Sequence, residues 1–138
     1  MVVINPAVEP QDDATLEALR ARLDRGEATT GPRGTDVADP AASPECCPRT
    51  PVGSLLSLYE AVRELVPRLG DIVCPSLVMT SVTDHEVSTS ASDFLARALA
   101  GPVERLALPR SFHVATLDHD RLLVEAHARE FVHKVTAG

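Results

Sequence analysis

Two apolar runs on either side of a helix-like stretch constrain the fold of this chain more than any other feature. The runs are residues 76–80 and 106–108, and each is typical of a buried strand. Apolar residues recur between them at helical spacing, and Gly101-Pro102 ends the helix. These helical positions are Ala91, Phe94, Leu95, Ala98 and Leu99. Because a strand, helix, strand crossover makes its strands parallel, the sequence predicts an α/β fold built on a parallel sheet.

A polar residue with useful chemistry follows each of these two strands. Asp84 comes after the first strand and His113 after the second. Parallel strands end at the same edge of a sheet, where the ligand sites of open α/β sheets lie, so we expect an acid and a base to be brought close together. The structural alternative is that Asp84 caps a turn and His113 caps a strand end.

The residues around this acid and base resemble the last part of an α/β-hydrolase. The resemblance rests on residues 74–79 with Asp84 and Val87, on residues 111–118, and on an amphipathic helix that closes the chain. It is greatest to small carboxylesterases and monoacylglycerol lipases. In that family the acid of the catalytic triad follows the seventh strand and the histidine follows the eighth. The resemblance therefore implies that Asp84 is the triad acid and His113 the triad base.

The resemblance extends over residues 53–135 and, more weakly, over residues 1–10, which are similar to the sixth strand and the loop after it. No G-x-S-x-G sequence occurs in the chain, so the nucleophile elbow of the family is missing. The resemblance implies a partial α/β-hydrolase fold with the last three strands, flanking helices and a lid. An in-frame G-x-S-x-G immediately upstream of the start codon would favour a shortened enzyme.

Two functions are compatible with this pattern. The first is the C-terminal portion of a carboxylesterase-type serine hydrolase, which supplies the acid Asp84 and the base His113 for an ester with a short or medium acyl chain. The alternative is a catalytically inactive remnant or an interaction module that pairs with another α/β-hydrolase half. A chain with an acid and a base but no nucleophile or oxyanion hole cannot complete acyl transfer, so its status as an enzyme stays open.

The chain divides into three segments. Residues 1–10 are expected to hold a short strand and the loop after it. Residues 11–70 are expected to form the lid or cap, with a mobile loop at 27–51 that has almost nothing to bury. The resemblance implies that residues 71–138 are the C-terminal α/β-hydrolase segment with the acid and the histidine.

The remaining helices can be predicted from capping residues and apolar spacing. Asp12 or Asp13 can start a helix that ends near Arg25, with Gly26 as its stop. A second helix is expected at 53–69, where Pro67 disturbs only the last turn. Its apolar face comprises Leu55, Leu58, Val62, Leu65 and Leu69. A last helix is expected to begin at Asp118 or Asp120.

Composition excludes several classes of partner. The net charge of −7 argues against nucleic acid and anionic membranes, since both attract basic patches. With 3% aromatic residues and no Trp, the chain also lacks stacking platforms for single-stranded nucleic acid. No apolar run approaches the length of a membrane span, and Met1 is not followed by a basic leader, so a cytoplasmic location is expected. The expected partner is a small ester substrate.

The chain itself is a further expected partner. In the resembling fold the last three strands are neighbours in order, so Val2-Val3-Ile4 should pair with residues 76–80, and these with residues 106–108. The outer edge of Val2-Val3-Ile4 is then unpaired and carries no protecting Lys, Pro or bulge. The isolated chain is therefore expected to self-associate or to be partly unfolded until a complementary half binds.

Three other groups have chemistry that deserves comparison with Asp84 and His113. His85 is expected to be solvated, because adjacent side chains on a loop rarely face each other. Asp118-His119-Asp120 resembles a metal cluster, but helix capping explains its aspartates and a third ligand at fixed spacing is missing. Cys46-Cys47 lies in a Pro-rich loop without an elbow, so surface thiols are expected there. No metal and no cofactor is expected.

Overall fold

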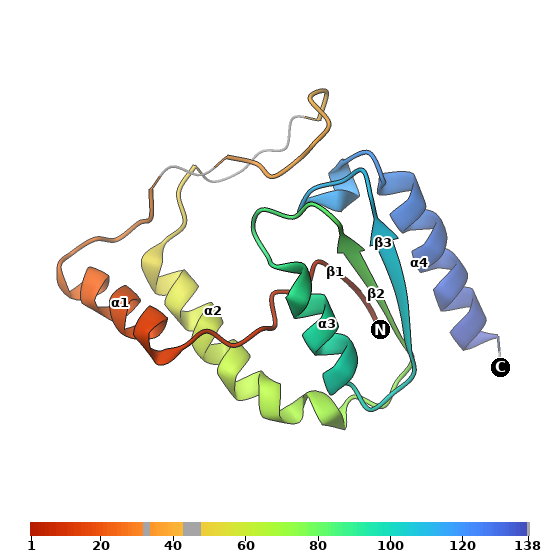
Figure 1. The fold of residues 1–138 in the computed structure, drawn as a ribbon, viewed down its shortest axis with the longest axis horizontal. Coiled ribbons are helices and arrows are strands. Elements are labelled where there is room, and N and C mark those ends of the chain that lie inside the picture. Colours follow the sequence, from red (N-terminus) through yellow and green to blue (C-terminus); the bar gives the residue numbers. More distant parts are fainter. Residues whose placement is uncertain (32–33, 43–47, 138) are drawn as a thin grey trace.

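The computed structural model describes residues 1–31, 34–42 and 48–137 and centres on a small parallel sheet (Figure 1). The three strands are β1 (Val2–Ile4), β2 (Ser76–Ser81) and β3 (Val103–Leu108). They are hydrogen-bonded in the order β1-β2-β3, and both pairs are parallel. The α/β class and the predicted order of the three strands are therefore confirmed.

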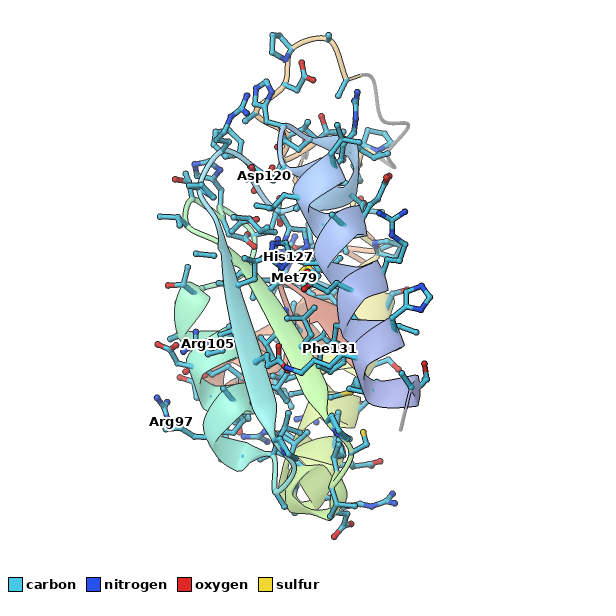
Figure 2. The ribbon with its side chains drawn as sticks, turned by 90° about the vertical axis from the view of Figure 1, so that its right-hand side faces the viewer. Met79, Arg97, Arg105, Asp120, His127 and Phe131 are labelled. Atoms are coloured by element: carbon cyan, nitrogen blue, oxygen red, sulfur yellow. The ribbon has the colours of Figure 1, made fainter. Side chains whose placement is uncertain are left out.

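Helices cover both faces of this sheet. Helix α3 (Thr89–Ala98) lies on one face and α4 (Arg121–Thr136) on the other, as Figure 2 shows from the side. Successive residues of a strand point to opposite faces, so β2 contributes to both cores. The core under α4 contains Leu77, Met79, Leu108, Ala115, Val124 and Phe131. The core under α3 contains Val78 with Leu69, Leu95 and Leu99.

Strand β3 is longer than the predicted residues 106–108. It begins at Val103, which pairs with Ser76. The extra residues include Glu104 and Arg105, which interrupt the apolar run but are stabilised on this edge strand by ion pairs. Glu104 bonds Lys134 of α4 at 2.7 Å, and Arg105 bonds an aspartate of α3 at 2.6 Å. Charged side chains are normal on edge strands, so hydropathy alone shortens the prediction.

Two antiparallel helices form the region that the sequence assigns to a lid. Helix α1 (Asp13–Asp24) begins after the cap Asp12, and Gly26 follows its end with a positive φ of 77°, a conformation that glycine adopts without strain. Helix α2 is Val52–Leu65. Ion pairs between Arg20 and Glu60 and between Asp13 and Arg63 link the two helices, and Leu16, Leu19, Val52 and Val62 are buried.

The predicted helix over 53–69 is divided into α2 and a 3₁₀ helix, η1 (Val66–Asp71). The change coincides with Pro67, which has no N–H to continue the α-helical pattern. Of the predicted apolar face, Val62 and Leu69 are buried, whereas Leu58 and Leu65 are exposed. None of the helices in the described ranges is long and apolar enough to cross a membrane.

Candidate active site

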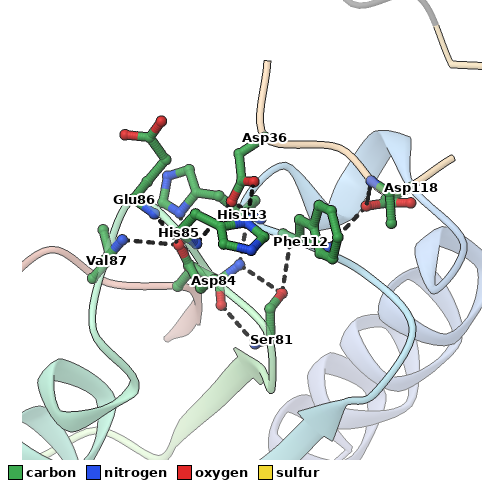
Figure 3. Close-up of polar contacts among 11 residues, drawn as sticks. Asp36, Ser81, Asp84, His85, Glu86, Val87, Phe112, His113 and Asp118 are labelled. Atoms are coloured by element: carbon green, nitrogen blue, oxygen red, sulfur yellow. Dashed lines mark hydrogen bonds and ion pairs between the residues drawn. The ribbon is translucent and has the colours of Figure 1, made fainter. Parts of the chain in front are cut away.

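Asp84 and His113 are in contact at the edge where β2 and β3 end. The Oδ2 atom of Asp84 lies 2.8 Å from Nδ1 of His113 (Figure 3). The Asp84 side chain is 2% exposed, whereas the His113 side chain is 29% exposed. The structure thus brings together the two residues that the sequence singled out, with the carboxylate beneath and the imidazole nearer the surface.

The second oxygen of Asp84 is also occupied. Its Oδ1 atom accepts hydrogen bonds from the backbone N–H groups of Glu86, at 2.9 Å, and Val87, at 2.8 Å. Asp84 therefore caps a turn and contacts the histidine at the same time, so the two interpretations of this residue are compatible. The turn fixes the direction in which the carboxylate faces His113.

The backbone of His113 is anchored on both sides. Its N–H donates to Oδ2 of Asp36 at 3.0 Å, and its carbonyl accepts from Nδ2 of Asn5 at 2.8 Å. With Nδ1 directed at Asp84, the ring presents Nε2 as its second nitrogen, and this atom has no hydrogen-bond partner among the described residues. A proton could therefore be exchanged at Nε2 with a group outside the described residues.

A cavity of about 520 Å³ adjoins His113. Its apolar lining comes from Ala7, Leu55, Leu58, Tyr59 and Val87, and its other lining residues are Thr30, Gly31, Thr50, Glu86 and His113. Three of the apolar residues lie on α2, including Leu58, whose exposure is thus explained by a face turned to a cavity instead of a core. The volume and the mixed lining suit a small organic molecule.

Asn5 joins the ends of β1 and β2 to the loop after β3. It is buried and has a positive φ of 47°, which Asn tolerates better than most residues. Its side chain donates to Oγ of Ser81 at 2.9 Å and accepts from the Ser81 N–H at 2.8 Å. Ser81 Oγ in turn donates to the carbonyl of Phe112 at 2.7 Å. The sequence offered only the strand-ending Asn5-Pro6 as a signal for this role.

Asp36 is a largely buried carboxylate that sequence reasoning missed. Its side chain is 10% exposed and accepts hydrogen bonds from the N–H groups of His85 and His113, both at 3.0 Å. Its Oδ1 also lies 2.6 Å from Nδ1 of His85. Burial alone would raise the pKa of Asp36, but hydrogen bonds from the His85 backbone, the His85 ring and the His113 backbone outweigh it and lower the pKa below its usual value.

His85 agrees only partly with the expectation of a solvated residue. Its side chain is 57% exposed, yet its ring bonds Asp36 and packs edge-on against Phe112, with ring centroids 4.6 Å apart. It does not face the neighbouring Asp84. The histidine in contact with Asp84 is therefore His113.

Asp118 connects the loop after β3 to residues 34–42. Its side chain is fully buried and accepts hydrogen bonds from the N–H groups of Ala38, Asp39, Phe112 and His119. Burial alone would raise the pKa of Asp118, but the hydrogen bonds from these four backbone donors outweigh burial. The pKa of Asp118 therefore lies below its usual value. The expectation that helix capping explains this aspartate is wrong, because its side chain braces loops.

Asp120 is the residue before α4, but its side chain caps no helical N–H and accepts from the N–H of Arg110 at 2.8 Å.

Within the described ranges no three His, Cys, Asp or Glu side chains form a group that could hold a metal ion. Cys74 is an exposed free thiol. The prediction about Cys46-Cys47 lies outside the described residues.

Comparison with curated sequences shows a similarity to a lipase. The chain is 31% identical over 102 residues to the thermostable monoacylglycerol lipase of Bacillus sp. strain H-257. The aligned part is 73% of this chain and 41% of that lipase. The chain thus spans less than half the length of this relative. No family model matches the chain.

Solved structures match over almost the whole chain. A structure of the metagenome-derived lipolytic enzymes LipS and LipT has a TM-score of 0.85 and 28% identity, covering 96% of this chain and 54% of that one. The monoacylglycerol lipase of Paleococcus ferrophilus has a TM-score of 0.68 and 14% identity, covering 91% and 58%. A thermophilic esterase from Thermogutta terrifontis has a TM-score of 0.60 and 16% identity, covering 97% and 55%. The last two show the likeness of the fold alone.

Proposed function

Because the chain belongs to the α/β-hydrolases and is similar to about half of a monoacylglycerol lipase or esterase, we propose that it supplies the acid and the base of a carboxylic ester hydrolase. The observation that carries the proposal is the 2.8 Å contact between Asp84 Oδ2 and His113 Nδ1 beside the cavity. The nucleophile has to come from outside these 138 residues, since they contain no G-x-S-x-G sequence.

In the proposed mechanism, His113 acts through Nε2. This nitrogen takes the proton of the nucleophilic hydroxyl as the hydroxyl attacks the ester carbonyl, and later gives the proton to the leaving alcohol. Asp84 accepts the Nδ1–H of His113, which keeps Nε2 unprotonated before the attack and stabilises the imidazolium after it. The two backbone bonds to Asp84 hold its carboxylate in place during both steps.

The cavity supports a small ester as the substrate. Leu55, Leu58 and Val87 offer apolar surface to an acyl chain, while the imidazole of His113 lies in the same lining. We propose a short or medium acyl chain, because a cavity of about 520 Å³ falls within the range of sites for small organic molecules.

The test compares the isolated chain with a completed protein, which here means the chain joined to a nucleophile-bearing N-terminal half of an α/β-hydrolase. The isolated chain should show no serine-dependent turnover of p-nitrophenyl esters, because loss of the nucleophile of a triad costs about a million-fold in turnover. The completed protein should hydrolyse the ester. Labelling of a serine in the isolated chain by a fluorophosphonate, with matching ester hydrolysis, would contradict the proposed division of roles.

A second candidate function is an interaction module that pairs with another α/β-hydrolase half. It is favoured by β1, which lies at an edge of the sheet with no described strand on its outer side. Complementation separates the two functions. An ester hydrolase requires His113 for activity in the completed protein, whereas a module needs only to bind the other half.

A further inference from the structure

One oxygen atom of Asp36 connects the two loops that carry the acid and the base. The backbone N–H of His85, the residue after Asp84, and the backbone N–H of His113 both lie 3.0 Å from Oδ2 of Asp36 (Figure 3). Two donors that share one acceptor cannot move apart without breaking a bond. The separation of the Asp84 loop from the His113 loop is therefore limited by a side chain that belongs to neither.

Asp36 lies in residues 34–42, which the chain places over the edge where the strands end (Figure 1). The attachment is reciprocal. Residues 34–42 contribute the Asp36 carboxylate and also the Asp36 carbonyl, which accepts from the N–H of Val114 at 3.1 Å. The loop after β3 contributes the buried Asp118, which accepts from the N–H groups of Ala38 and Asp39 at 2.8 and 3.0 Å.

We propose that Asp36 is a positioning residue that aligns Asp84 with His113. Residues 34–42 therefore have to be bound to the Asp84 and His113 loops for this acid and base to act together. This inference rests on the proposed function of Asp84 and His113. Asp36 touches neither the substrate cavity nor the reacting nitrogen, and it acts through the backbone of His85 and His113. The two backbone N–H groups require an oxygen acceptor at the position of Oδ2 and do not require a negative charge there.

Two substitutions separate the position of the acceptor from its charge. Asp36→Asn keeps an oxygen where Oδ2 stands and places its NH₂ group toward His85 Nδ1, which can accept in the other tautomer. Asp36→Glu keeps the charge but adds a methylene, which displaces the oxygen. The matched controls are Asp39→Asn and Asp39→Glu, because the Asp39 carboxylate lies in the same segment but touches neither His85 nor His113. It bonds the N–H of Ala41, and its Oδ2 lies 3.9 Å from Nδ1 of His119.

The first measurement is ester hydrolysis by the completed protein. Asp36→Glu should lower kcat by about 10-fold to 100-fold with little change in KM, since a misplacement of about 1 Å at an active site can cost that much. Asp36→Asn should keep kcat within about threefold of the unsubstituted protein, as should both Asp39 variants. A loss in Asp36→Asn that equals or exceeds the loss in Asp36→Glu would overturn the proposal, and so would an unchanged Asp36→Glu.

The second measurement does not depend on activity. Amide hydrogen exchange of the completed protein should be about tenfold faster at His85 and His113 in Asp36→Glu than in Asp36→Asn, because a displaced acceptor leaves both amides open more often. Equal protection in the two variants would show that Asp36 does not hold the loops.

The activity of His113→Ala distinguishes failure of this inference from failure of the proposed function. If His113→Ala is fully active, the proposed function has failed. If His113→Ala is inactive while Asp36→Glu is fully active and protected, only this inference has failed.

Discussion

The side-chain amide of Asn5 donates a 2.8 Å hydrogen bond to the backbone carbonyl of His113, a residue 108 positions later in the chain. Its two bonds to Ser81 place the same side chain at the end of β2. One amide thus connects the ends of β1 and β2 to the residue proposed as the base. The polar network beneath the site is therefore part of what holds the sheet together.

Replacing Asn5 tests the strength of this network. Asn5→Ala should lower the free energy of unfolding of the completed protein by about 2–4 kcal/mol, because the Ser81 N–H and the His113 carbonyl lose buried partners. Asn5→Gly removes the same bonds but suits the positive φ, so it should be about 1 kcal/mol less destabilised than Asn5→Ala. Urea unfolding measures the free energy of unfolding of both variants. Since one hydrogen bond contributes about 1 kcal/mol, a loss of less than about 0.5 kcal/mol in Asn5→Ala would contradict the role of the network.

The buried carboxylate of Asp118 predicts how stability depends on pH. Its pKa is lowered in the folded protein, so its stabilising contribution is complete above the unfolded pKa of about 3.9 and disappears as the pH falls through the lower folded pKa. At pH 7, Asp118→Asn should be less stable by about 1–3 kcal/mol, because it loses hydrogen bonds to a charged acceptor.

The pH dependence of the completed protein supplies the check. The difference in unfolding free energy between the unsubstituted protein and Asp118→Asn should shrink as urea unfolding is repeated from pH 7 down to about pH 3. Asp71→Asn is the control, since that carboxylate lies on the surface of η1 with its side chain 74% exposed. A difference that stays constant over the whole range would show that the charge of Asp118 is not what the four donors recognise.

The outer edge of β1 predicts association of the isolated chain. The carbonyl of Met1 and the N–H of Asn5 form hydrogen bonds with β2. Because successive residues of a strand direct their backbone groups to opposite sides, the N–H groups of Val2 and Ile4 point away from β2. We expect sedimentation at micromolar concentration to detect oligomers or partly unfolded chain, and the completed protein to be monomeric. Val2→Pro removes one outward donor without breaking the ladder and should reduce oligomer formation. A compact monomer with a sharp thermal transition would contradict this expectation.

Much of the framework was predictable because it depends on local patterns. The apolar runs, the helical spacing between them and the stop at Gly101-Pro102 were enough to predict a parallel pair and the side of the sheet on which Asp84 and His113 lie. Helix α1 was equally accessible, since Asp12 accepts a hydrogen bond from the Thr15 N–H as an N-cap should. The identification of Asp84 and His113 as catalytic stays a prediction.

The residues that hold the site in place were not predictable, because their partners are distant in sequence. Asp36 stands 49 positions before His85 and 77 before His113, in a stretch whose composition indicated only a loop. Asp118 looked like a helix cap because acidic residues are common there, but none of its four donors is a helical N–H of α4. Two of them lie in residues 34–42, and the other two lie in its own loop after β3. The exposed Leu58 on α2 lines the cavity, because an apolar helix face can line a cavity as well as a core.

The most direct test of the account is the rate of p-nitrophenyl ester hydrolysis by the completed protein when Asp84 and His113 are replaced one at a time. The account predicts that His113→Ala lowers kcat by about a million-fold and Asp84→Asn by about 10⁴-fold, the latter because Asn favours the wrong tautomer of the ring. His127→Ala, on α4, is the histidine control and should keep full activity (Figure 2). Full activity in His113→Ala or in Asp84→Asn would contradict the central claim.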